Sequence, residues 1–365
     1  MATSDIDREL IAACGDGDLS ATVACVEAGA DVDAMPDGVT ALHAAIAARS
    51  LGVVRYLVER ADTNAATADG RTPLHLAARV GSDRIVSLLL NHDARPDAAD
   101  ASGRTPLMVA AERASPAVVA ELLAAGATMD ARDRMGRTAL SGACAERRWD
   151  VVKILLRSAA APNAVRMADA NGATPLIEAA DSAPDEIIEA LLAKGADPNA
   201  VAQPGTTPLL EAVMGGNLAA AQVLIAAGAN ARFADDRSDT VLHHAAGLPS
   251  KEMLKVLLRH TRAAADVGSA NGNRRTPLHL AAMHLRWRNI VQLLKAGASP
   301  DAVDGAGLTP RDYARTLSPP GPPTGDATDI NYVTDHFVNW DVWTKGPPGP
   351  REAVDQSDYD PWLSD

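Results

Sequence analysis

Histidine and cysteine are the residues of this chain whose chemistry would most readily support catalysis or metal binding. They include His43, His75, His243 and His279, at one recurring place of a repeated segment, and Cys14, Cys25 and Cys144 elsewhere. A zinc site needs several ligands brought together, and no second ligand type accompanies these histidines at a fixed spacing. Recurrence at one structural position favours an architectural role, so the sequence predicts no metal site.

The sequence also lacks the motifs that position groups for catalysis. It contains no phosphate-binding glycine loop and no nucleophile-elbow motif, and an active site needs a nucleophile, an acid–base pair or a metal. We therefore predict a protein that is not an enzyme, with no catalytic residues and no cofactor. The three cysteines are a sparse, odd set within helical segments. They predict small buried side chains without a disulfide framework, and a reducing, cytoplasmic setting.

One threonine recurs along the chain and sets its organisation. Its positions are Thr40, Thr72, Thr105, Thr138, Thr174, Thr207, Thr240, Thr276 and Thr309. The spacings are 32, 33, 33, 36, 33, 33, 36 and 33 residues, and related text such as TALHAA or TPLHLAA begins at most of them. A period of this length indicates a repeat architecture in which each unit packs against its neighbours.

The segment 69–90, DGRTPLHLAARVGSDRIVSLLL, predicts two short helices in each repeat. Thr72 can cap the first helix, and Pro73 suits the first helical position because it loses no hydrogen bond there. Gly81 ends that helix, and the apolar residues from Ile85 onward follow the stripe of a second, half-buried helix. Neither helix is long enough to be stable alone, so each repeat depends on its neighbours.

Glycines close many of the second helices, and turn-forming residues lead from them to the next threonine. Examples of these glycines are Gly126, Gly195, Gly228 and Gly297. They suit the left-handed conformation past a helix end, and the Asp/Asn/Gly-rich text after them predicts a hairpin-like turn. Together with the period and the T-P-L-H motif, these features resemble the ankyrin repeat over roughly residues 5–318.

The resemblance implies an all-α, ankyrin-repeat solenoid of helix-turn-helix units with short hairpin-like turns. It also implies that the recurring histidine is a structural hydrogen-bonding group that ties its turn to the adjacent repeat. Residues 1–34 are predicted to be a more polar amino-terminal capping repeat, residues 35–302 eight ankyrin-type repeats, and residues 303–318 a partial carboxy-terminal repeat with only a first helix.

Residues 319–365 are a Pro/Gly-rich linker and an acidic aromatic tail. They contain nine acidic and two basic residues, and six of the eleven aromatic residues of the chain. Val333, Phe337 and Trp340 share one helical face that would cover the truncated last repeat as a cap. Alternatively, the tail occupies the chain's own concave surface or docks another protein. We favour the cap, because an uncovered terminal repeat exposes apolar surface.

Two intervals are three residues longer than the others, within residues 163–173 and 260–275. We interpret them either as longer fingers on a binding edge or as neutral loop variation. Trp149 and Trp287 each lie eleven residues after their threonine, at the start of a second helix. Packing at a helix junction is favoured there over exposure to a partner.

The charge and hydropathy of the chain exclude several classes of partner. The net charge of −13 argues against nucleic acid or an anionic membrane as the main partner. No run approaches the roughly 20 apolar residues of a membrane span, and the amino terminus lacks the pattern of a signal peptide. Residues 251–291 are locally basic, with eight basic and two acidic side chains. We expect a monomer that binds a protein.

Partner binding is expected through the turn fingers and the concave face of the first helices, where arginines recur. The residues predicted to bind a partner are Arg71, Arg79, Arg104, Arg113, Arg134, Met135, Arg137, Arg237, Arg274, Arg275, Met283 and His284. This surface leans basic and predicts an acidic segment in the partner, although arginine is also a common solvated surface residue. The second interpretation is an adaptor or regulatory subunit that recruits a client to an enzyme, with the tail as another docking motif.

Overall fold

The structure is a computed structural model that describes residues 3–113, 115–260 and 266–317. Within these ranges the chain is helical, and its only β pairing is one isolated bridge between Ala202 and Thr206. This confirms the predicted all-α class. The described residues form two compact units, which are divided between Asp236 and Arg237. The predictions made for the tail, residues 319–365, lie outside the described residues.

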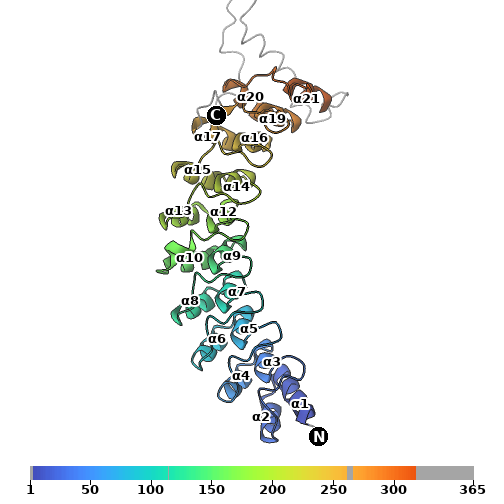
Figure 1. Ribbon diagram of the computed structural model, residues 1–365, viewed down its shortest axis with the longest axis vertical. Helices are drawn as coiled ribbons and strands as arrows, with labels where there is room; N and C mark the ends of the chain where they lie inside the picture. Colours follow the sequence, from blue (N-terminus) through green and yellow to red (C-terminus); the bar gives the residue numbers. More distant parts are fainter. Residues whose placement is uncertain (1–2, 114, 261–265, 318–365) are drawn as a thin grey trace, which may run out of the picture. The chain divides into compact units, whose positions relative to one another are not determined.

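The first unit is a stack of antiparallel helix pairs, in which the first helices and the second helices form two separate columns (Figure 1). The first helices are α1 (Thr3–Asp16), α3 (Ala41–Ala47), α5 (Pro73–Val80), α7 (Pro106–Arg113), α9 (Ala139–Ala145), α12 (Pro175–Ala180) and α14 (Pro208–Met214). The second helices are α2 (Leu19–Glu27), α4 (Leu51–Val58), α6 (Asp83–Leu90), α8 (Pro116–Ala124), α10 (Trp149–Arg157), α13 (Asp185–Ala193) and α15 (Leu218–Ala226).

The second unit repeats the same arrangement. Its described helices are α16 (Val241–Gly247), α17 (Lys251–His260), α19 (Pro277–Met283), α20 (Trp287–Lys295) and α21 (Pro310–Leu317). First helices α16, α19 and α21 pack in sequence, and α17 packs on α20. The ninth repeat contributes the first helix α21, as the sequence predicts.

Each repeat begins and ends with the residues that the sequence assigns to these positions. Thr72 has extended backbone angles, φ −86° and ψ 165°, and forms a capping box at the start of α5, with Pro73 as the first helical residue. Gly81 ends α5 in the left-handed conformation, and Gly126 does the same after α8, with φ of 75° and 84°. These caps supply partners for backbone groups that a short helix leaves unpaired.

The core runs between the two columns of helices and is made of small and aliphatic side chains. In the repeat of α5 and α6, Leu74, Ala77, Val86 and Leu89 are completely buried. Corresponding alanines and leucines recur in the neighbouring repeats, and each first helix packs on the next first helix. Burial of apolar surface between neighbours therefore stabilises helices that are only seven to nine residues long.

Of the two interpretations of the longer intervals, the described residues favour loop variation over longer fingers. The first interval contains an additional helical turn, α11 (Ala161–Ala164), between α10 and the next anchor threonine. The turn that follows, residues 169–173, has the same hydrogen bonds as the turns at residues 100–104 and 133–137. Residues 271–275 of the second interval also keep this geometry. Residues 261–265 of that interval lie outside the described residues.

The tryptophans and cysteines occupy structural positions. Trp149 and Trp287 are each the first residue of a second helix and are half-buried. Cys14 and Cys144 are buried, as predicted, but Cys25 is only half-buried on α2. All three carry free thiols. None of the described helices is long and apolar enough to pass through a lipid bilayer.

Candidate functional site

The recurring histidine connects each repeat to the next one. In the repeat of α5, Nδ1 of His75 accepts a hydrogen bond from the backbone N–H of Thr72 at 3.2 Å and lies 2.9 Å from its hydroxyl oxygen. The other ring nitrogen, Nε2, lies 2.8 Å from the carbonyl oxygen of Arg104 in the following repeat. His43, His243 and His279 make equivalent bonds, which confirms the predicted structural role.

This arrangement requires a neutral imidazole, because Nδ1 acts as an acceptor while Nε2–H donates. Burial lowers the pKa of His43, His75 and His279, and the hydrogen bond to the next repeat's carbonyl only partly offsets it. These three histidines are consequently suited to neutral pH as structural groups. None of them is positioned as a metal ligand, since both ring nitrogens already have partners.

Several of the turns before the anchor threonines are shaped by a carboxylate or amide side chain that the sequence analysis did not single out. We call the five residues before each anchor threonine a finger. At its first position, Oδ1 of Asp100 accepts hydrogen bonds from the backbone N–H groups of Ser102 at 2.8 Å and Arg104 at 3.0 Å. Asp133 and Asp169 do the same in the next two fingers. Their recurrence five residues before the threonine was visible in the sequence.

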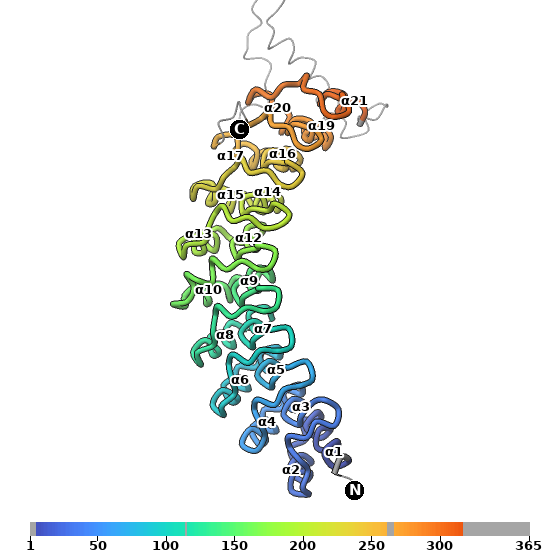
Figure 2. Tube along the Cα trace, in the orientation of Figure 1, coloured from blue at the N-terminus to red at the C-terminus, as the bar shows by residue number. Residues whose placement is uncertain are grey.

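The fingers of the first unit follow one another along one edge of the stack (Figure 2). Single backbone hydrogen bonds join neighbouring fingers. The N–H of Ala101 donates to the carbonyl of Asp69 at 2.9 Å, and the N–H of Arg134 donates to the carbonyl of Ser102 at 2.9 Å. Gly70 permits this approach. Its φ is +77°, and a Cβ atom there would lie 2.8 Å from the backbone nitrogen of Ala101. The fingers therefore form a continuous, ordered edge.

Four of the predicted partner-binding residues line one cleft on the first unit. This basic cleft has a volume of about 290 Å³ and lies between α5 and α7 with their fingers. Its charged and titratable lining side chains are Arg71, His75, Arg79, Asp100, Arg104 and Arg113. Four arginines against one aspartate give the cleft a positive potential that attracts anions.

The four arginines differ in how far they are already paired. Arg71 forms an exposed ion pair with Asp69 at 3.0 Å, and Arg104 forms a largely buried one with Glu112 at 2.7 Å. Arg79 is exposed. The pKa of Asp69 is lowered chiefly by its hydrogen bond from the Thr67 hydroxyl, then by the charge of Arg71, and to a smaller extent by the charge of Arg79. Arg113 is exposed and makes no hydrogen bond or ion pair with the described residues. Two arginines of the cleft are thus available to a ligand.

The next cleft along the first helices has the opposite charge. This acidic cleft, between α7, α9 and α12, is lined by Glu112, Arg137, Glu146, Asp169 and Glu178, among others. Burial raises the pKa of Glu178, and the nearby Asp169 and Glu211 raise it further. Arg137, predicted as a binding residue, instead donates from Nε and a terminal nitrogen to the buried Asp133, at 3.0 and 2.8 Å. Arg134 and Met135 lie on the same finger as Arg137, residues 133–137, and are exposed.

The remaining predicted residues belong to the second unit. Arg237, Arg274 and His284 are exposed there, and Met283 is half-buried at the end of α19. Arg275 is part of a structural network: Nε donates to Asp304 at 3.3 Å, and a terminal nitrogen donates to the hydroxyl oxygen of Tyr313 at 3.1 Å. Asp304 also accepts from that hydroxyl at 2.7 Å, so Arg275 anchors α21.

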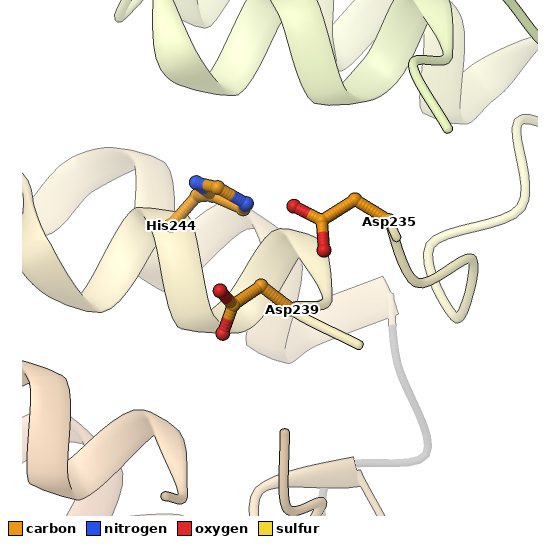
Figure 3. Close-up of side chains that lie close together, drawn as sticks. All are labelled: Asp235, Asp239 and His244. Carbon is orange, nitrogen blue, oxygen red and sulfur yellow. The ribbon is translucent and has the colours of Figure 1, made fainter. Parts of the chain in front are cut away.

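Potential metal ligands occur where the second unit begins. Asp239 and His244 belong to this unit, and Figure 3 draws them together with Asp235, which belongs to the first unit. Asp239 is already engaged, because Nδ2 of Asn271 donates a hydrogen bond to its Oδ1 at 2.7 Å. All three side chains take part in interactions of their own, and we assign no metal site to them.

Comparison with known proteins agrees with this architecture. A family model described as "Ankyrin repeats (3 copies)" matches residues 59–133, 114–202 and 203–304. A second model, "Ankyrin repeats (many copies)", matches residues 26–77. These matches cover more than half of the chain, which therefore belongs to the ankyrin repeat family. The family is an interaction module, so the class of protein defined by the fold and by the exposed clefts is a protein-binding solenoid.

Individual relatives match part of this chain and a smaller part of their own length. The chain is 36% identical over 145 residues to the mitochondrial disaggregase of Bos taurus, a match that covers 38% of this chain and 21% of the relative. It is 32% identical over 159 residues to the B-cell lymphoma 3 protein homolog of Mus musculus, covering 43% of this chain and 34% of the relative. The matched parts thus span about a third or less of these relatives.

One solved structure also resembles the chain. The ankyrin repeat domain of Bcl-3, titled a unique member of the IkappaB protein family, is 30% identical with a TM-score of 0.51. The match covers 60% of this chain and 99% of that domain. The likeness supports a stack of ankyrin repeats.

Proposed function

We propose that this chain is a non-catalytic interaction scaffold that binds an acidic segment of a partner protein. The segment lies on the concave face of the first helices and contacts the fingers, with the basic cleft as its main site. The observation that carries the proposal is the convergence of Arg71, Arg79, Arg104 and Arg113 on one cleft. Because guanidinium groups bind carboxylates in a bidentate geometry, this cleft favours an anionic partner over a neutral one.

Arg79 and Arg113 are the residues with which to test the proposal. Reversing the charge of Arg104 or Arg137 would place a carboxylate beside Glu112 or Asp133 and would destabilise the fold as well as the site. Arg79 and Arg113 are exposed and contribute no hydrogen bond or ion pair to the described structure. The matched control is Arg84→Glu, in the same repeat as Arg79 but on the second helix α6.

The experiment compares three baits in affinity capture with mass spectrometry: the unchanged chain, the Arg79→Glu/Arg113→Glu variant and the Arg84→Glu control. Proteins retained by the unchanged chain and the control but not by the double variant are the expected partners. Their affinity for the purified chain should fall as salt rises, because exposed charges are screened. If every captured protein is retained equally by the three baits, the basic cleft is not the binding site.

The alternative is an adaptor or regulatory subunit that uses the acidic aromatic tail, residues 319–365, as a second docking motif. The concentration of six aromatic residues in this segment favours it. A truncation after Ser318 separates the possibilities: loss of stability indicates a cap, whereas loss of a partner from a chain of unchanged stability indicates docking. Cytoplasmic location and a monomeric state are further parts of this proposal, testable by cell fractionation and by light scattering.

A further inference from the structure

The basic cleft is short, which restricts the kind of anion that fits it. It is built from two adjacent repeats, and its arginines come from α5, α7 and the fingers that precede them. Neighbouring first helices lie roughly 10 Å apart, which an extended peptide spans with about three residues. A ligand therefore has to place its negative charge within a distance of this order.

The acidic cleft limits the ligand on one side. A run of aspartates or glutamates that continued past α7 would approach Glu112, Glu146, Asp169 and Glu178. The pKa of Glu178 is raised by burial and by its acidic neighbours, so this region is already crowded with negative charge. Like charges repel over a Debye length of roughly 8 Å, and a long acidic run is consequently disfavoured. The basic cleft therefore favours a ligand whose negative charge lies on one group over a ligand whose charge is spread along a run of residues.

The arginines provide the geometry for a concentrated anion. Arg79 and Arg113 come from two different helices and are exposed in one cleft of about 290 Å³. The Nε atom of Arg104, in the same cleft, is buried and has no hydrogen-bond partner among the residues that the structure describes. An acceptor that drew this guanidinium away from Glu112 would satisfy that donor. A phosphoryl group carries nearly two charges and three acceptor oxygens on one atom centre, whereas a carboxylate carries one charge and two oxygens.

Building on the proposed scaffold function, we propose that the basic cleft binds a phosphorylated side chain in the partner segment. Arg79 and Arg113 are the principal ligands of the phosphoryl oxygens, and Arg71 and Arg104 lie at the margin of the site. The acidic cleft excludes further acidic residues on the α9 side and favours neutral or basic ones there. Phosphorylation of the partner then switches binding on.

The test uses the full chain and three short fluorescent peptide libraries with the same random flanking positions. The central residue is phosphoserine in the first library, aspartate in the second and serine in the third. Peptides selected on the unchanged chain are resynthesised with each of the three central residues, and their affinities are measured by fluorescence anisotropy. The phosphoserine form is expected to bind at least about tenfold more tightly than the aspartate form. The Arg79→Glu/Arg113→Glu variant should lose this difference, and Arg84→Glu should keep it.

The possible outcomes separate this proposal from the scaffold function. If aspartate and phosphoserine peptides bind equally and both depend on Arg79 and Arg113, the cleft is a general acidic-segment site, and only the phosphoryl preference is overturned. Selection of no peptide, while the unchanged chain still captures partners, also overturns it. Two further results would do the same: inorganic phosphate binding as tightly as the peptide, or binding only to vesicles that contain a phosphorylated lipid. Circular dichroism of each variant checks that the fold is retained.

Discussion

At the scale of the residue, the histidines make the stability of the repeats depend on pH. Unfolded imidazoles take up protons near pH 6.5. His43, His75 and His279 have lowered pKa values in the folded chain and stay neutral to a lower pH. Below pH 6.5 the unfolded state therefore binds more protons, so the free energy of unfolding decreases as the pH falls. Above pH 6.5 both states are neutral at these positions, and their contribution is constant.

The expected size of this effect is at most about 1.4 kcal/mol per pH unit for each histidine. It can be measured by urea unfolding at pH 7.5 and pH 5.5 of the unchanged chain and of a His75→Gln variant. The variant should be less stable at pH 7.5, because two repeats lose a connection. It should also lose less stability on acidification. Parallel pH dependences for the two proteins would contradict the assignment. The chain should tolerate the change, since Met108, Ser141, Ile177 and Leu210 occupy the equivalent position.

Ionisation of Glu178 should make the free energy of unfolding decrease as the pH rises, opposite to the effect of the histidines. Its pKa is raised by burial and by Asp169 and Glu211, so the folded state disfavours its ionised form. A Glu178→Gln variant is expected to have a higher melting temperature at pH 7. The gain should disappear near pH 4, where the carboxyl group of the unchanged protein is increasingly protonated. Glu189→Gln, an exposed site on α13 of the same repeat, is the control. An equal gain in both variants would point to net charge as the cause.

At the scale of the element, the fingers depend on close contact between backbones. Gly70→Ala should destabilise the chain, because its φ of +77° disfavours a side chain and the new Cβ would lie 2.8 Å from the nitrogen of Ala101. Gly38 has an almost identical φ, +78°, at the same position of the preceding finger, but no atom lies within 4 Å of a Cβ there. The conformational cost of about 1–2 kcal/mol is therefore common to both variants.

The difference in free energy of unfolding between Gly70→Ala and Gly38→Ala isolates the finger contact. We expect Gly70→Ala to be the more destabilising of the two in chemical denaturation. Hydrogen exchange at the N–H of Ala101, which donates to the carbonyl of Asp69, should also be faster in that variant. Equal losses in the two variants would show that the finger contact contributes nothing.

The elements themselves were largely predictable from the sequence, because their signals are local and periodic. Thr72, Pro73 and Gly81 mark the bounds of α5 through capping and backbone conformation alone. The threonine and the proline recur in most repeats. The convergence of Arg71 and Arg104 on one edge also followed from the period. What could not be predicted was which charged side chains pair with one another. The hydrogen bond from Arg104 to Glu112 depends on how the side chain of Arg104 on its finger lies against the last turn of α7.

At the scale of the whole molecule, the contacts of a repeat protein are mostly between neighbours, so parts of it can fold separately. Residues 1–236 form a compact unit with its own buried core. This segment, produced alone, should be helical by circular dichroism and should unfold cooperatively in urea. It should also keep the affinity of the basic cleft for the selected peptides, since every lining residue lies within it. A non-cooperative transition would show that it needs the rest of the chain.

The short helix α11 has a practical consequence for work with this protein. Three additional residues were absorbed between α10 and the finger at residues 169–173, and that finger kept the hydrogen bonds of its neighbours. The connection at Ala161–Ala164 thus accommodates additional residues without a change in the finger that follows. An epitope tag or a fluorescent reporter grafted at the exposed Pro162 and Asn163 would sit away from both clefts and leave them open to a ligand.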